Sequence, residues 1–101
     1  MAGQGKLSEL KARKKVLSAN SGTNINWTYH ITTASTITLP DSSTLSVGDK
    51  VVFTKKLGVV PTIQRFGSTV LIKTSIGTDS AVFFDIEAEI IFVWNGVEWE
   101  V

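Results

Sequence analysis

The residues of this chain that could do chemistry are a series of spaced carboxylates, one histidine and three tryptophans. Asp85, Glu87 and Glu89 occur at every second position, as residues on one face of a strand do, and Asp79 lies upstream. A pair of carboxylates can catalyse glycoside hydrolysis. A series at this spacing is more often a solvated strand face or protects a sheet edge from pairing, and we favour that structural interpretation.

His30 is the only histidine, and the chain has no cysteine. A metal site or a general base would need partners of these types, so we interpret His30 as an ordinary surface or interface residue. Serine and threonine are abundant, but no GxSxG motif accompanies them. We therefore predict no enzyme activity, no cofactor and no catalytic or metal-binding residue.

The three tryptophans are the residue type on which sugar rings stack. Trp94 and Trp99 fall on the apolar face of a predicted hairpin, and Trp27 falls on the inward face of an alternating segment. Large aromatic side chains at such positions usually pack in a core. We favour core packing over a sugar-binding platform.

Residues 90–101, IIFVWNGVEWEV, carry the strongest local signal in the chain. Asn95-Gly96 predicts a two-residue type I′ turn, which needs positive φ at both positions. That turn sets Phe92 opposite Trp99 on one apolar face. A hairpin cannot bury such a face alone, so the rest of the chain must supply a second layer.

Ile91 and Val93 fall on the opposite face of this predicted hairpin, beside Glu100 and Glu98. Apolar side chains next to carboxylates are either partly exposed or covered by a partner. We predict that Ile91 and Val93 lie in a subunit interface.

Short alternating segments bounded by turn residues recur through the chain before this hairpin. Such spacing is typical of an all-β fold, and we predict a small antiparallel β-sandwich or barrel that ends in a β-hairpin. Pro61 lacks an N–H group, which marks its segment as irregular or as an edge strand, and SIGTDS at residues 75–80 is predicted to be a loop. The predicted strands are residues 24–32, 35–39, 50–55, 59–66, 69–74 and 81–84.

The formal net charge of +1 conceals an asymmetry. Residues 1–20 hold five basic side chains and one acidic side chain, whereas residues 21–101 are acidic overall. We divide the chain at this point into a basic anchoring arm and a β-domain. Residues 6–17 are rich in good helix formers, so the arm is predicted to be a short helix or, failing that, an extended segment.

The arm has three interpretations. It is a solvated amphipathic helix, it binds nucleic acid, or it anchors the protein to an acidic protein surface. Aromatic residues are missing from the arm and the remainder is acidic, so we favour anchoring and predict no nucleic-acid partner. The apolar runs are far too short for a membrane span. The predicted anchoring residues are Lys6, Leu7, Leu10, Lys11, Arg13, Lys14, Lys15 and Leu17.

Four short motifs follow one another in a characteristic order. They are TITLP at residues 36–40, VGD at 47–49, GST at 67–69, and WNG at 94–96 followed by WEV at 99–101. This order resembles a β-module of bacteriophage virion proteins, of the tail-fibre, tailspike and head-decoration type. The resemblance covers nearly four-fifths of the chain, and each motif in it has a structural role.

The resemblance implies a structural virion protein, displayed on the surface of the phage particle as a homotrimer. Because one basic arm stands in front of the module, we expect a capsid decoration or head-fibre protein that is anchored to a capsid or other virion protein. The alternative is a tail-fibre or tailspike-associated protein that binds host surface glycans.

Overall fold

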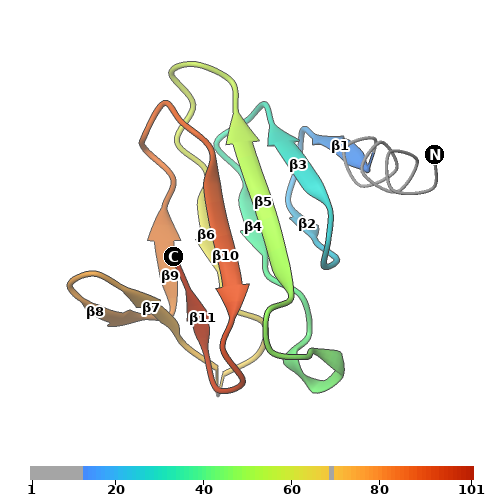
Figure 1. The fold of residues 1–101 in the computed structure, drawn as a ribbon. Helices are drawn as coiled ribbons and strands as arrows, with labels where there is room; N and C mark the ends of the chain where they lie inside the picture. The colour runs from blue at the N-terminus through green and yellow to red at the C-terminus, as the bar shows by residue number, and fades with distance from the viewer. Residues whose placement is uncertain (1–12, 69) are drawn as a thin grey trace.

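The computed structural model describes residues 13–68 and 70–101, and this part of the chain is built of β-strands (Figure 1). The all-β class is therefore confirmed. A short 3-10 helix, η1 (Ser42–Thr44), follows Asp41. The strands are β1 (Lys14–Leu17), β2 (Ser21–Gly22), β3 (Thr28–Ile31), β4 (Thr36–Thr38), β5 (Lys50–Lys55), β6 (Thr62–Gln64), β7 (Ile72–Thr74), β8 (Gly77–Asp79), β9 (Ala81–Phe83), β10 (Ile90–Trp94) and β11 (Trp99–Glu100).

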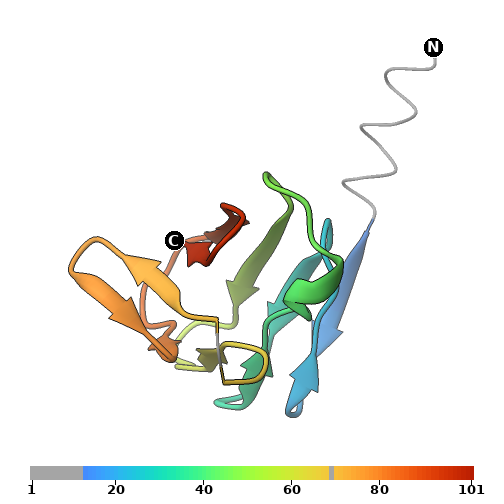
Figure 2. The ribbon, with the colours of Figure 1, turned by 90° about the horizontal axis from the view of Figure 1, so that it is seen from below.

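The strands form two mixed sheets that enclose one core. The larger sheet has the order β1-β3-β5-β10-β11-β7-β8, and the smaller sheet has the order β2-β4-β6-β9. The first six strands alternate between the sheets, so the chain winds from one sheet to the other (Figure 2). A strand that returns to its own sheet after such a crossing runs parallel to its predecessor.

This winding makes β1, β3 and β5 parallel in the larger sheet, and β2, β4 and β6 parallel in the smaller one. Antiparallel pairs join β5 to β10, β6 to β9, β7 to β8 and β10 to β11. The prediction of antiparallel sheets is therefore wrong for the first half of the chain, and also for β7, which pairs parallel with β11. Alternation along a strand predicts which side chains face inward, but not the direction of the neighbouring strand.

β10 and β11 pair through Val93 with Glu100 and through Trp94 with Trp99. The predicted register, in which Phe92 lies opposite Trp99, is wrong by this pairing. The side chains of Phe92, Trp94 and Trp99 nevertheless all face the core, as the alternation predicts.

The connection between β10 and β11 spans four residues instead of two. Gly96 has φ +99°, but Asn95 does not have positive φ, so the connection is not the predicted type I′ turn. Asn95 Oδ1 accepts the backbone N–H groups of Val97 and Glu98 at 2.9 and 2.8 Å. By satisfying two backbone donors, this side chain stabilises a four-residue loop. The pair of strand residues nearest the loop is then Trp94 with Trp99.

β6 lies between β4 and β9, so the predicted edge position for this segment is wrong. Pro61 precedes the strand, where its missing N–H group removes no bond from the ladder. The predicted loop at residues 75–80 contains β8, which pairs antiparallel with β7.

The core is formed by inward-facing side chains of both sheets. Tyr29 stacks on Phe53 at 6.0 Å between ring centroids, and Phe53 meets the edge of Phe92 at 5.6 Å. Ile37 and Leu39, and likewise Val51 and Phe53, alternate with other residues along their segments, and all four are buried. The buried apolar residues are Leu17, Tyr29, Ile31, Ile37, Leu39, Val51, Phe53, Ile63, Val70, Ile72, Phe84, Phe92, Trp94 and Trp99.

β1 is the edge strand of the larger sheet, and it pairs parallel with β3 from Lys14 with Thr28 to Leu17 with Ile31. The predicted helix is therefore wrong for these four residues, and the rest of that prediction lies outside the described residues. Helix propensity differs by less than about 1 kcal/mol per residue among such side chains, which sheet pairing and the burial of Leu17 outweigh.

Candidate functional site

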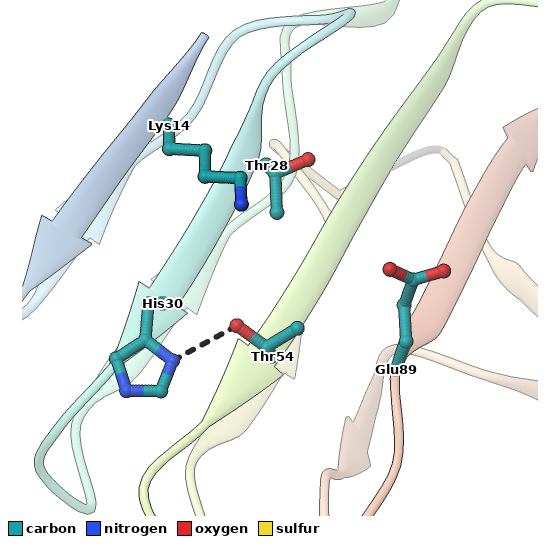
Figure 3. A pocket seen from close by; sticks show the side chains of 5 residues that line it. All are labelled: Lys14, Thr28, His30, Thr54 and Glu89. Carbon is teal, nitrogen blue, oxygen red and sulfur yellow. Dashed lines mark hydrogen bonds between the residues drawn. The ribbon is translucent and has the colours of Figure 1, made fainter. Parts of the chain in front are cut away.

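The outer face of the larger sheet carries the side chains that alternate with those of the core. An open hollow of about 540 Å³ lies on this face over β1, β3 and β5 (Figure 3). Lys14, Thr28, His30, Thr54 and Glu89 line it. Parallel pairing places these residues together, because Lys14 pairs with Thr28 and His30 pairs with Thr54.

A hydrogen bond of 2.9 Å joins His30 Nδ1 to Thr54 Oγ1 in this hollow. Lys14 reaches from β1 toward Thr28, and Glu89 stands across β5 from His30 (Figure 3). The hollow therefore combines an ammonium, two hydroxyls and an imidazole on paired strands with a carboxylate from the segment before β10.

A second hollow, of about 200 Å³, adjoins the first and shares Thr28 with it. Asn26, Trp27, Lys50 and Val52 complete its lining. Asn26 adopts φ +63° and donates its backbone N–H to Lys50 O at 2.7 Å, which fixes the bend before β3. The two hollows share Thr28, and we refer to them together as the β3–β5 groove.

The tryptophans divide between core and surface. Trp94 and Trp99 are buried, with ring centroids 5.5 Å apart, so their predicted core role is confirmed. Trp27 is half-buried: it packs against the core and also lines the second hollow. Its ring stacks on Tyr29 at 6.2 Å with an interplanar angle of 24°.

The carboxylate series does not lie on a strand. Asp85, Glu87 and Glu89 belong to the exposed segment between β9 and β10. Glu87 forms an ion pair with Lys55, Glu89 lines the β3–β5 groove, and Asp85 lies with Asp79 beside a separate hollow. The predicted strand face is therefore wrong, because the chain turns here.

The predicted anchoring residues have different environments. Arg13, Lys14 and Lys15 are exposed at or beside the edge strand β1, whereas Leu17 is buried in the core. Leu17 packs between the two sheets, and its predicted anchoring contact stays a prediction. Lys6, Leu7, Leu10 and Lys11 lie outside the described residues.

The two residues predicted for a subunit interface lie on the outer face of β10. Ile91 is 42% exposed and Val93 is half-buried. Ile91 pairs with Val52 of β5, and Val93 pairs with Lys50. Val52, Ile91 and Val93 therefore form an apolar patch, here called the β10 patch, which shares Val52 with the groove.

Nothing in the sequence groups Thr28, Thr54 and Glu89 into one site. Alternation with core residues places Thr28 and Thr54 on the outer face, and the parallel pairing of β3 with β5 brings their strands together, whereas Glu89 comes from the segment before β10. No local pattern in a single strand carries that information.

A comparison of the chain with known protein families matches no family model, and a comparison with curated proteins finds no significant relative. Within residues 13–68 and 70–101, no group of three or more metal-ligating side chains is placed to hold a metal ion. The described part of the chain also has no helix long and apolar enough to cross a membrane.

Proposed function

We propose that the chain is a structural protein of a bacteriophage virion, displayed on the particle surface as a capsid decoration or head-fibre protein. The order of the TITLP, VGD, GST and WNG motifs supports this class. Two of these motifs are in contact: Gly48 N–H donates to Trp94 O, and Trp94 N–H donates to Asp49 O, both at 2.8 Å. These two hydrogen bonds join the VGD and WNG motifs in the fold.

The observation that carries the anchoring proposal is the exposed basic segment at the edge of the larger sheet. Arg13, Lys14 and Lys15 are exposed, and the buried Leu17 fixes the strand that bears them. An edge strand also has backbone groups on the side away from β3, which a partner strand or loop can pair with. Cationic side chains around such an edge favour an acidic capsid surface.

Replacing Arg13 and Lys15 together by Glu tests this anchor. We expect co-sedimentation with the phage particle to fall by at least about tenfold, because attraction becomes repulsion. The matched control replaces Lys56 and Lys73 by Glu, which makes the same charge change on the body. Equal loss in both variants, or full binding by the Arg13 and Lys15 variant, would contradict anchoring at β1.

The β10 patch is the surface that we propose for a homotrimer. Val52, Ile91 and Val93 are adjacent apolar residues on the outer sheet face, and covering them would remove apolar surface from water. Ile91→Lys should therefore convert a trimer to monomers in sedimentation equilibrium. Val97→Lys is the control, because Val97 is 77% exposed in the β10–β11 loop, away from the patch. A wild-type chain that stays monomeric with and without particles would contradict the trimer.

A further inference from the structure

We propose that the free edge of β9 binds an extended segment of a partner protein, in which basic side chains flank an apolar middle. The bound segment adds one strand to the smaller sheet. β9 and the basic strand β1 lie on opposite sides of the molecule (Figure 1), so this surface is separate from the anchor at β1. The inference does not depend on the proposed virion role.

The backbone of β9 offers hydrogen-bonding groups at the sheet edge. β9 is the last strand in the order of the smaller sheet and pairs antiparallel with β6. Ser80 O and Phe84 N–H form hydrogen bonds of 2.9 Å with the residues that flank β6. Backbone groups of successive residues in such a strand point to opposite sides, so those of Ala81 and Phe83 point away from β6.

A hollow of about 450 Å³ lies beside this edge, between β9 and the tip of the β7–β8 hairpin. All three residues of β9 line it, and Thr74, Ser75 and Ile76 line it from the hairpin. Ile76 is 93% exposed and Phe83 is 73% exposed, so two large apolar side chains meet water next to the free backbone groups. A polypeptide strand can satisfy both features, because it has amides at strand spacing and side chains that alternate.

Asp79 and Asp85 give the hollow its charge. Both carboxylates line the hollow and are exposed, and its lining residues in the described part of the chain include no lysine or arginine. The two ion pairs that the described residues form involve neither of them. Such carboxylates attract a basic partner and repel an acidic one. The charge therefore assigns a basic segment to this edge.

The positions of the two carboxylates define the order of side chains in the partner. Asp79 precedes β9 by two residues and Asp85 follows it by two, so the apolar side chain of Phe83 lies between them. Residues of an added strand lie opposite those of β9, so basic side chains about six residues apart can reach both carboxylates. The peptide KTVTVTK has this order on one face, with two valines between two lysines.

The test is a nuclear magnetic resonance titration of the ¹⁵N-labelled full chain with the end-capped peptide KTVTVTK. Low ionic strength is used, because salt screens attraction between exposed charges. We expect a Kd below about 2 mM, and binding at least about fivefold weaker for the charge-reversed peptide ETVTVTE. The largest shifts should fall on the amides of Ala81 and Phe83, and both amides should exchange with solvent more slowly in the complex.

N-methylated peptides test the backbone pairing itself. Alternate amides of an added strand face β9, and methylation removes the N–H group that pairs. One peptide is methylated at both valine amides, and the other at the first two threonine amides. We expect only one of the two peptides to lose binding, by about tenfold or more. Equal binding by the two methylated peptides would contradict strand addition.

A double variant tests the charge of the hollow. Asp79→Asn combined with Asp85→Asn should weaken KTVTVTK by at least about threefold. The control combines Glu89→Gln with Glu98→Gln, which removes two negative charges elsewhere and should leave binding unchanged. Equal loss in both double variants would show that net charge, and not this hollow, attracts the peptide.

Phe83→Ser tests the apolar contact. This change should weaken KTVTVTK about three- to tenfold, because the valines of the peptide lose the apolar surface beside them. Val97→Ser is the matched control, since Val97 is 77% exposed in the β10–β11 loop. It should leave binding unchanged.

Three further results would overturn the proposal. They are no binding of KTVTVTK up to about 5 mM, shifts centred away from β9, and equal affinity for ETVTVTE. Dilution of the chain without peptide provides a fourth test. If dilution alone shifts the amides of Ala81 and Phe83, the edge binds a second copy of this chain, and the assignment to a partner protein is wrong.

Discussion

Asn95 and Gly96 illustrate how two residues determine the pairing of two strands. The Asn95 side chain holds the loop by accepting two backbone N–H groups, and Gly96 supplies the positive φ that the loop requires. A β-carbon added at Gly96 would lie 3.1 Å from Val47 Cγ2, closer than nine in ten such contacts. Both residues are therefore restricted, each for a different reason.

We expect Gly96→Val to lower the free energy of unfolding by about 1–3 kcal/mol, through backbone strain and the contact with Val47. Gly58→Val is the matched control, because Gly58 has φ +83° and open space around it. The difference between the two melting temperatures isolates the Val47 contact. If the two variants melt together, that contact carries no cost.

Asn95→Gly should cost about 1 kcal/mol, since it removes the acceptor of two loop N–H groups. A type I′ turn would have made this change nearly neutral. Thermal unfolding of this variant therefore distinguishes the two turn geometries, and an unchanged melting temperature would favour the type I′ turn.

Tyr29 links stability to pH at the residue scale. Burial raises the pKa of its hydroxyl above the ordinary value, and the Asn24 backbone N–H that donates to Oη at 2.7 Å lowers it by less. The folded chain therefore holds this proton more tightly than the unfolded chain. Stability is fully present below about pH 10 and falls as pH rises toward the pKa of the folded state.

Denaturant titrations between about pH 8 and 11 check this expectation. Tyr29→Phe removes the ionisable group, so its stability should fall less steeply over the same range than that of the wild type. Equal slopes for both proteins would show that Tyr29 does not carry the effect.

At the scale of elements, β1 is the segment whose structure the sequence predicted least well. Its lysines and leucine are good helix formers. Leu17, however, fills the core, and the strand pairs parallel with β3 at the edge of the larger sheet. A tertiary contact of this kind overrides a local preference.

Leu17→Ala should cost about 2–4 kcal/mol, because it leaves a cavity between the sheets. Val16→Ala should change stability by less than about 0.5 kcal/mol, since Val16 is 65% exposed on the same strand. Urea unfolding of both variants provides the measurement. Similar, small effects would mean that residues 14–17 do not pack as a strand of the body.

The strand positions that sequence alone could predict are those whose signal is local. Lys50–Lys55 alternates Val51 and Phe53 inward, and the structure has a strand with those bounds. The parallel order of the strands depends instead on partners that are far apart in sequence, with a strand of the other sheet between them. The β3–β5 groove depends on that order, so its residues could not be grouped from the sequence.

At the scale of the whole molecule, Lys55 closes one end of the space between the sheets. Its side chain is 1% exposed, it forms an ion pair with Glu87, and its ammonium lies 5.8 Å from the centroid of the Phe84 ring. An inward-pointing charge at a sheet end is stable only while a partner compensates it.

Glu87→Ala should therefore cost about 1–2 kcal/mol, less than for a fully buried pair because Glu87 itself is 47% exposed. Glu100→Ala is the comparison, because its pair with Lys73 is 3.9 Å long and exposed on both sides. We expect less than about 0.5 kcal/mol there. Chemical denaturation of the two variants shows whether the Lys55–Glu87 pair stabilises the fold more than the Lys73–Glu100 pair does.

β11 lies between β10 and β7 in the larger sheet, although β7 and β8 precede both in the chain (Figure 1). The β7–β8 hairpin can therefore join the sheet only after residues 99–100 have been synthesised and have paired with β10. On the ribosome, this hairpin stays without its sheet partner while the winding of the first six strands can already proceed. The order of synthesis and the order of assembly thus differ in this half of the chain, which makes the docking of β7 on β11 a late step in folding.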